Sequence, residues 1–146
     1  MPSFTKIAIT AAVLSLMSMA PAQAAEHVIK MLNKSGNKQM QFEPAFTMAA
    51  PGDTIKFVST DKGHSVESIP DMWPEGAKPV KGAISQDVTM TVDKEGVYGV
   101  KCTPHYLMGM VALIEVGKPT NLDKAKAFKA PGAAGKRFTE LFAEVK

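Results

Sequence analysis

Between His27 and Val116 the sequence is a succession of short runs of β-branched and aromatic residues, separated by turn residues. Such runs, with breakers at short intervals and no long helical pattern between them, are typical of an all-β sandwich or barrel. The stretch from Ile69 to Gly82 contains several prolines and glycines and is predicted to be an ordered loop. The predicted strands are His27 to Leu32, Gln39 to Phe42, Thr54 to Ser59, Ser65 to Ser68, Asp87 to Val92, Tyr98 to Cys102 and Val111 to Val116.

The pattern becomes helical after Gly117. Thr120 or Asn121 can cap a short helix through Phe128, and a second helix is predicted from Ala133 to Val145. The second helix has one apolar face with residues three and four positions apart: Phe138, Leu141, Phe142 and Val145. We expect this face to pack on the sandwich; a helix that binds a partner or a membrane is the alternative.

The composition fits one folded domain. The chain has 146 residues, of which 45% are hydrophobic and 21% charged, so a packed core is expected and disorder is not. The formal net charge is +3 and the sequence pI about 9.0. This weakly basic balance gives no argument for nucleic-acid binding but leaves acidic partners possible.

The first 24 residues have the pattern of a secretory signal peptide. Lys6 supplies the positive start, Ile7 to Met19 the apolar run, and Ala22-Gln23-Ala24 the small-x-small cleavage site. The run is shorter than the ~20 residues that a membrane-spanning helix needs. We expect cleavage after Ala24 and a single mature domain of residues 25–146 without a membrane anchor. Its sandwich would span about 26–117 and its helical extension about 120–146.

Cys102 is the only cysteine, so no disulfide can form within the chain. In an oxidising compartment a lone thiol needs protection, which either burial or ligation to a metal can supply. His105, Met108 and Met110 follow Cys102 closely, on a connection between two predicted strands. A thiolate, an imidazole and a thioether within nine residues point to a metal site rather than to a core cysteine alone.

The donor types favour copper over zinc. A structural zinc site wants four N, S or O ligands and has no use for methionine, whereas a copper that cycles between Cu(I) and Cu(II) suits two imidazoles, a thiolate and a weak axial thioether. His64, after the strand Thr54 to Ser59, supplies the second imidazole, and we interpret His27 as a surface residue. Met110 and Met108 compete for the axial position. Met110 is predicted to point inward because it shares a strand face with Ala112, Ile114 and Val116.

The sequence resembles the cupredoxins, and among them the pseudoazurins, over essentially the whole predicted mature chain. The segments that carry the resemblance are Met31 to Lys34, Phe42 to Ala45, Pro51 to Asp53, Asp61 to His64, Pro74 to Ala77 and Val100 to Met110, followed by the two terminal helices. The spacing Cys-x2-His-x4-Met is the pattern of pseudoazurins and plastocyanins, whereas amicyanins use Cys-x2-His-x2-Met.

The resemblance implies a two-sheet Greek-key sandwich with two C-terminal α-helices and one type 1 copper. It implies His64, Cys102, His105 and Met110 as the copper ligands. Ser65 stands where cupredoxins usually have Asn, a residue whose backbone N–H donates to the cysteine sulfur and whose side chain braces the ligand loop at Thr103.

The family also implies a function, namely a monomeric, periplasmic one-electron carrier. A nitrite reductase or similar respiratory enzyme would accept the electron and a cytochrome could donate it. The partners would dock on an apolar patch around His105 and on the lysines that surround it: Lys34, Lys62, Lys81 and Lys101. The sequence has no paired carboxylates, nucleophile–base arrangement or phosphate loop, so we expect no enzymatic activity. Copper storage or delivery, and a zinc-stabilised interaction module, are the alternatives.

Overall fold

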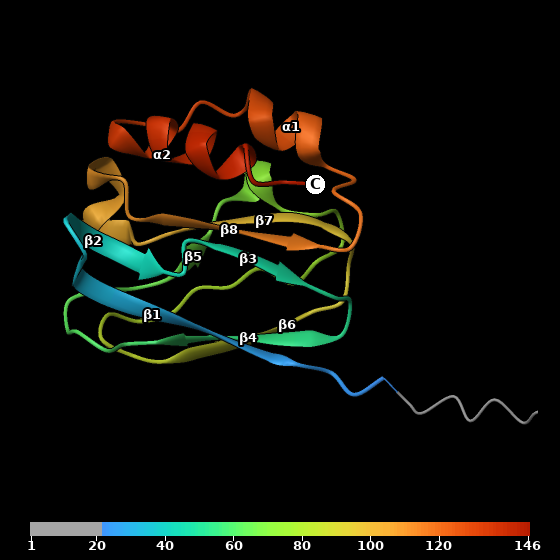
Figure 1. The fold of residues 1–146 in the computed structure, drawn as a ribbon, viewed down its shortest axis with the longest axis horizontal. Coiled ribbons are helices and arrows are strands. Elements are labelled where there is room, and N and C mark those ends of the chain that lie inside the picture. The colour runs from blue at the N-terminus through green and yellow to red at the C-terminus, as the bar shows by residue number, and fades with distance from the viewer. Residues whose placement is uncertain (1–21) are drawn as a thin grey trace, which may run out of the picture.

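Two four-stranded sheets pack face to face in the computed structural model, and two C-terminal helices lie over the outer face of one of them (Figure 1). The structure describes residues 22–146, so most of the predicted signal peptide lies outside the described residues. The strand orders are β2-β1-β4-β6 and β3-β8-β7-β5. The elements are β1 (Glu26–Ser35), β2 (Lys38–Glu43), β3 (Phe46–Ala49), β4 (Asp53–Val58), β5 (Glu67–Ser68), η1 (Pro70–Met72), β6 (Val88–Val92), β7 (Gly96–Lys101), η2 (Thr103–Met108), β8 (Val111–Val116), α1 (Leu122–Ala127) and α2 (Ala133–Phe142).

The predicted two-sheet sandwich with two terminal helices is confirmed, and each predicted strand is present with small shifts at its ends. The structure has one further strand, β3, which was not predicted from the sequence. β3 is a four-residue edge strand that pairs in parallel with β8. Its short segment between Pro44 and Pro51 has no clear alternation of apolar and polar residues, so only pairing with a distant strand defines it.

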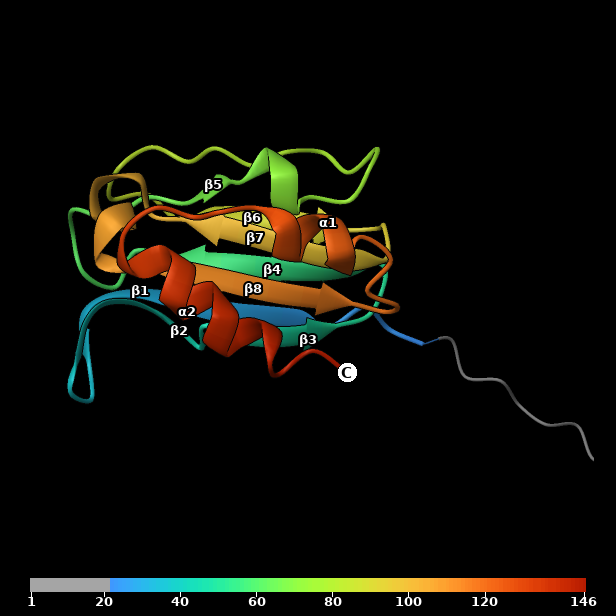
Figure 2. The same cartoon turned by 90° about the horizontal axis from the view of Figure 1, so that it is seen from above.

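β8 is the centre of the core because all six of its residues are buried. Ala112, Ile114 and Val116 face the interior between the sheets, together with Met110. Val111 and Leu113 point the other way and pack against α2. The strand therefore carries one apolar layer on each side, which the helices complete (Figure 2).

The apolar face of α2 packs on the sandwich, as predicted. Phe138 and Leu141 are buried, and Phe142 and Val145 are partly buried in the same cluster. The helix ends at Phe142 rather than at Val145. Neither helix in the described part of the chain is long and apolar enough to cross a membrane.

Asn121 is the N-cap residue of α1, one of the two candidates that the sequence predicted, but its side chain makes no capping hydrogen bond. Its Oδ1 accepts from the Val97 N–H at 2.7 Å and its Nδ2 donates to the Val97 carbonyl at 3.0 Å. β5 pairs only with Val100 and Lys101 of β7. The Asn121 amide thus satisfies backbone groups of β7 in a part of the strand that β5 does not reach.

The topology brings two connections to the same end of the sandwich, which carries the candidate site (Figure 1). One connection follows β4 and contains His64. The other joins β7 to β8 through η2, where Lys101 and Val111 are paired across the ladder. The Cys102 N–H donates to the Met110 carbonyl at 2.9 Å and so extends this ladder by one step.

At the start of β1, His27 is half-buried and its Nε2 lies 2.8 Å from Asp53 Oδ2. The same carboxylate accepts from the backbone N–H groups of Ala25 and Ala50, at 2.9 Å each. These bonds, that of Ala50 first, lower the pKa of Asp53 from 3.8 to about 2. Asp53 therefore joins the N-terminal strand to the turn before β4 as a carboxylate.

The depressed pKa predicts a specific dependence of stability on pH. The folded form favours the ionised carboxylate, so the stabilisation by Asp53 is complete above pH 3.8 and is lost as the pH falls toward about 2. We expect Asp53→Asn to lower the free energy of urea unfolding well above pH 3.8, and this deficit to shrink as the pH approaches 2. Glu75→Gln, at an exposed loop position, is the control. A deficit that is independent of pH over this range would contradict the prediction.

Candidate metal centre

The local sequence shapes the connection that carries Cys102 and His105. Cys102 follows β7 directly, and Pro104 lies in the first turn of η2, where a missing N–H costs nothing. Gly109 ends η2 in the left-handed conformation, with φ of 88°, and its N–H donates to the Tyr106 carbonyl at 3.0 Å. This cap turns the chain directly into Met110 and β8.

Three donor atoms converge where the two connections meet. The Nδ1 atoms of His64 and His105 are 3.1 Å apart. The Sγ atom of Cys102 lies 3.8 Å from the first of these nitrogens and 3.5 Å from the second. His64 and Cys102 are fully buried, whereas His105 is partly exposed. The structure thus brings together two imidazoles and one thiol that the sequence separates by up to 41 residues.

The two methionines that compete for the axial position differ in burial. Met110 is fully buried and belongs to the same core cluster as Cys102. Its backbone N–H donates to the His105 carbonyl at 3.3 Å. Met108 is 50% exposed, on the surface of η2. The burial therefore fits Met110 as the inward thioether and Met108 as a surface residue, as the strand parity predicted.

The outer nitrogen of His64 is held by Asn33, whose Oδ1 lies 2.8 Å from His64 Nε2. Because an amide oxygen only accepts, Nε2 carries the proton and Nδ1 keeps its lone pair toward the cluster. Burial, followed by the nearby His105, lowers the pKa of His64, while Asp61 acts in the opposite direction. These effects favour the neutral imidazole that a metal needs.

The Ser65 N–H donates to the Cys102 sulfur at 3.5 Å. This is the contact that the family resemblance implied. Burial raises the pKa of the Cys102 thiol, and the hydrogen bond from Ser65 opposes the rise. A thiolate in this apolar environment requires a positive charge beside it, which a bound metal ion supplies. The donor set and its surroundings therefore fit a metal with an affinity for sulfur and imidazole.

The side chain of Ser65 connects the two ligand-bearing segments. Its Oγ accepts from the Thr103 N–H at 3.3 Å, and the Thr103 hydroxyl donates to Glu67 Oε2 at 2.8 Å. Ser65 and Glu67 thus brace Thr103, a role that the resemblance implied for an Asn side chain at this position. Sequence reasoning did not assign the roles of Asn33 and Glu67, because both contacts join residues more than thirty positions apart and no local motif marks them.

The remaining predicted residues lie around this cluster. His27 is not part of it and pairs with Asp53 instead. Lys34, Lys62 and Lys81 are exposed, and Lys101 is partly buried with its Nζ 5.1 Å from the centre of the Tyr106 ring. Each lysine is close in sequence or pairing to a site residue. Lys34 follows Asn33, Lys62 precedes His64 by two positions, Lys101 precedes Cys102, and Lys81 is bridged to Glu67.

Comparison with known proteins gives a consistent result. The family described as copper binding proteins, plastocyanin/azurin family, matches residues 29–117. A pseudoazurin of Paracoccus pantotrophus is 49% identical over 139 residues, covering 94% of this chain and 96% of that protein. A pseudoazurin of Methylorubrum extorquens is 46% identical over 140 residues, covering 95% of each. The crystal structure of native pseudoazurin from Hyphomicrobium denitrificans has a TM-score of 0.81 and 50% identity, covering 83% of this chain and 98% of that one.

The chain belongs to the copper-binding plastocyanin/azurin family, so it is a cupredoxin. The relatives confirm the predicted resemblance to pseudoazurins in particular. One type 1 copper is its cofactor, and its activity is electron transfer rather than catalysis, as predicted.

The Ser65 contacts lead to a prediction about copper affinity. Ser65→Ala removes the acceptor for the Thr103 N–H but keeps the backbone N–H at the Cys102 sulfur. We expect the affinity for copper to fall by about tenfold, the lower end of what outer-shell changes cost. Competition with a chelator of known affinity measures it. Ser35→Ala, at the last residue of β1, is the control and should leave the affinity unchanged. Equal affinities for the Ser65 variant and the wild type would contradict the bracing role.

Proposed function

We propose that His64, Cys102, His105 and Met110 hold the copper. The observation that carries this proposal is the convergence of two Nδ1 atoms and one Sγ atom within 4.8 Å, next to the core cluster that contains Met110. Bound copper supplies one-electron redox chemistry between Cu(I) and Cu(II). A thioether has no use in a zinc site, so the buried methionine favours copper over a zinc-stabilised module.

The surroundings of these residues suit a carrier that changes charge without rearrangement. His64 is held at its outer nitrogen by Asn33, and Cys102 is fixed between Ser65 and the β7–β8 ladder. Both side chains are fully buried, which keeps water away from them. Full burial also argues against copper storage or delivery, because exchange of the metal requires an accessible site.

His105 is the proposed route of the electron to the surface. It is the one partly exposed member of the cluster. Leu107 and Met108 follow it in η2 and are 67% and 50% exposed. Ile84 is 60% exposed and precedes Ser85, whose N–H donates to the His64 carbonyl at 2.8 Å. We define these three apolar residues as the apolar rim. Exposed apolar side chains gathered at a redox site are suited to brief contact with a partner.

The proposed setting is the periplasm, where a nitrite reductase or a similar respiratory enzyme accepts the electron and a cytochrome is a possible donor. The mature form would be a monomeric domain of residues 25–146. Two observations support export: the signal-peptide pattern, and the different coverage of the relatives. The match to the Paracoccus sequence covers 94% of this chain. The match to the solved Hyphomicrobium chain covers 98% of that chain but only 83% of this one.

The copper assignment is tested by spectroscopy of the exported protein, whose first residue should be Ala25. With one equivalent of Cu(II) we expect an intense visible thiolate-to-copper band and a narrow copper hyperfine splitting in electron paramagnetic resonance. Cys102→Ser should abolish both, because the thiolate is lost. Met108→Leu is the matched control and should retain both signals, since Met108 is exposed. A colourless wild type, or spectra unchanged by Cys102→Ser, would overturn the assignment.

The docking role of the lysines is tested by charge reversal. Lys34→Glu and Lys62→Glu should slow electron transfer to a periplasmic nitrite reductase at low ionic strength and flatten its dependence on salt, because surface charges act mainly on encounter. Stopped-flow kinetics measure both quantities. Lys118→Glu carries the same charge change at the opposite end of β8 and should have a much smaller effect. If the three variants behave alike, the lysines near the site have no special part in docking.

A further inference from the structure

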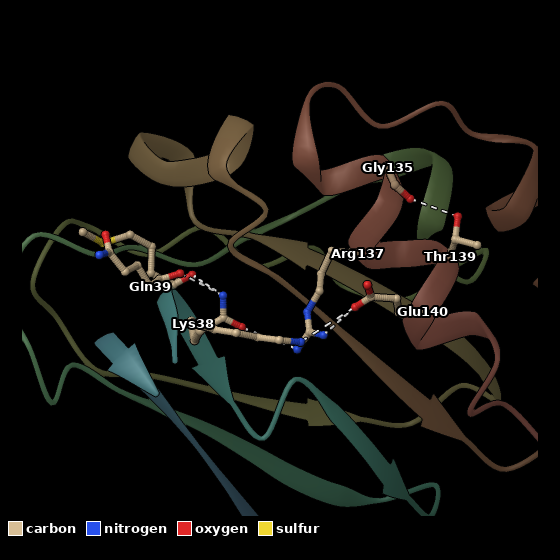
Figure 3. Close-up of polar contacts among 8 residues, drawn as sticks. Lys38, Gln39, Gly135, Arg137, Thr139 and Glu140 are labelled. Atoms are coloured by element: carbon tan, nitrogen blue, oxygen red, sulfur yellow. Dashed lines mark hydrogen bonds and ion pairs between the residues drawn. The ribbon is translucent and has the colours of Figure 1, made fainter. Parts of the chain in front are cut away.

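Lys38 of β2 reaches toward Arg137 and Glu140 of α2 (Figure 3). A cleft of about 330 Å³ lies here, between β2 and α2 and beside η2. Three basic side chains line it: Lys38 from β2, and Lys136 and Arg137 from α2. Met108 of the apolar rim lines it as well, so the cleft adjoins the surface around His105. None of these basic residues belongs to the lysines predicted for docking.

Among the described residues, Glu140 is the only acidic one that lines the cleft. Its Oε2 accepts from Arg137 Nη1 at 2.9 Å and lies 3.9 Å from Lys38 Nζ. The hydrogen bond from Arg137, first of all, lowers the pKa of Glu140, so the group is a carboxylate at neutral pH. The cleft therefore already holds one carboxylate, supplied by the chain itself.

Donor capacity remains after Glu140 is bound. Among the described residues Arg137 makes one further hydrogen bond, from Nη2 to Gln41 Oε1 at 3.5 Å, and its Nε is buried without a hydrogen-bond partner. Lys136 forms no ion pair within the described part of the chain. A guanidinium has five N–H donors in a planar fork that matches a carboxylate. The cleft can thus accept a second carboxylate, or one that replaces Glu140.

We propose that this cleft is a docking subsite for a carboxylate side chain of the acidic redox partner, and that Glu140 competes for it in the free protein. The inference rests on the proposed electron-carrier function. Two observations favour a protein carboxylate as the occupant: the charge complementarity, and the continuity of the cleft with the apolar rim through Met108. The Glu140 side chain is 46% exposed, so it can leave its partners without disturbing the core.

The first test uses hexacyanocobaltate(III), a redox-inert trianion, with the copper-loaded protein in the diamagnetic Cu(I) state. We expect nuclear magnetic resonance shifts at Lys38, Lys136 and the Arg137 Nε–H during titration. Glu140→Gln should lower the Kd of the trianion, as reported by these signals, by about threefold, because an exposed ion pair no longer has to be broken. Glu144→Gln is the control, because it makes the same charge change at an exposed residue outside the cleft. Lys136→Gln should weaken the binding.

The second test measures electron transfer to a periplasmic nitrite reductase by stopped-flow. Glu140→Gln should raise the second-order rate constant at low ionic strength by more than Glu144→Gln does, and Lys136→Gln should lower it. If the trianion shifts no cleft signal, or if the two glutamate variants behave alike in both tests, this proposal is overturned. The charge reversals at Lys34 and Lys62 separate that result from a failure of the proposed function. If those reversals slow the reaction and Glu140→Gln leaves it unchanged, only the cleft is misassigned.

Discussion

The Ser65 N–H that points at the Cys102 sulfur ties the connection that carries His64 to the end of β7, where the candidate ligands meet. Ser65 follows His64 directly and lies two residues before β5, which pairs with β7 in the same sheet, and Cys102 follows β7. The separation of 3.5 Å between these atoms therefore continues the pairing of β5 with β7 into the site. β8 holds β7 in place from its other side, because a strand buried on both faces cannot shift without exposing an apolar layer. The site therefore depends on the core at least as much as on its own loops.

Sequence reasoning predicted the parts of this arrangement that local patterns define. A short run of apolar residues located β8, and the parity from Met110 to Val116 placed Met110 inside and left Met108 outside. Long-range contacts carry no such signature. The strand β3 exists only through its pairing with β8, and the Asn121 amide, expected at a helix start, bonds to Val97 instead. In each case a partner distant in the sequence decided the outcome over the local preference.

The contacts that hold the site were the least predictable part of it. Cys-x2-His and a histidine after β4 indicated a metal, since the donor types themselves limit the chemistry. Nothing in the sequence assigned Asn33 to His64, or Glu67 to Thr103, because these bonds connect separate strands and loops. These partners set the tautomer of the imidazole and the position of the loop. A ligand set can thus be predicted from a motif, while its orientation depends on the tertiary structure.

The attraction of an acidic partner likewise depends on where the surface charges lie. The formal net charge of the whole chain is only +3, so an acidic partner responds to where the cations lie more than to their sum. Lys62 and Lys101 are near neighbours of His64 and Cys102 in the sequence, so their distance from the site cannot change much. Lys38 and Arg137 differ, since both pair with the single carboxylate of Glu140, across two elements. Screening over about 10 Å limits the reach of any single charge. A carboxylate held between two cations at the edge of the apolar rim therefore lowers the local potential more than the same charge on a remote face.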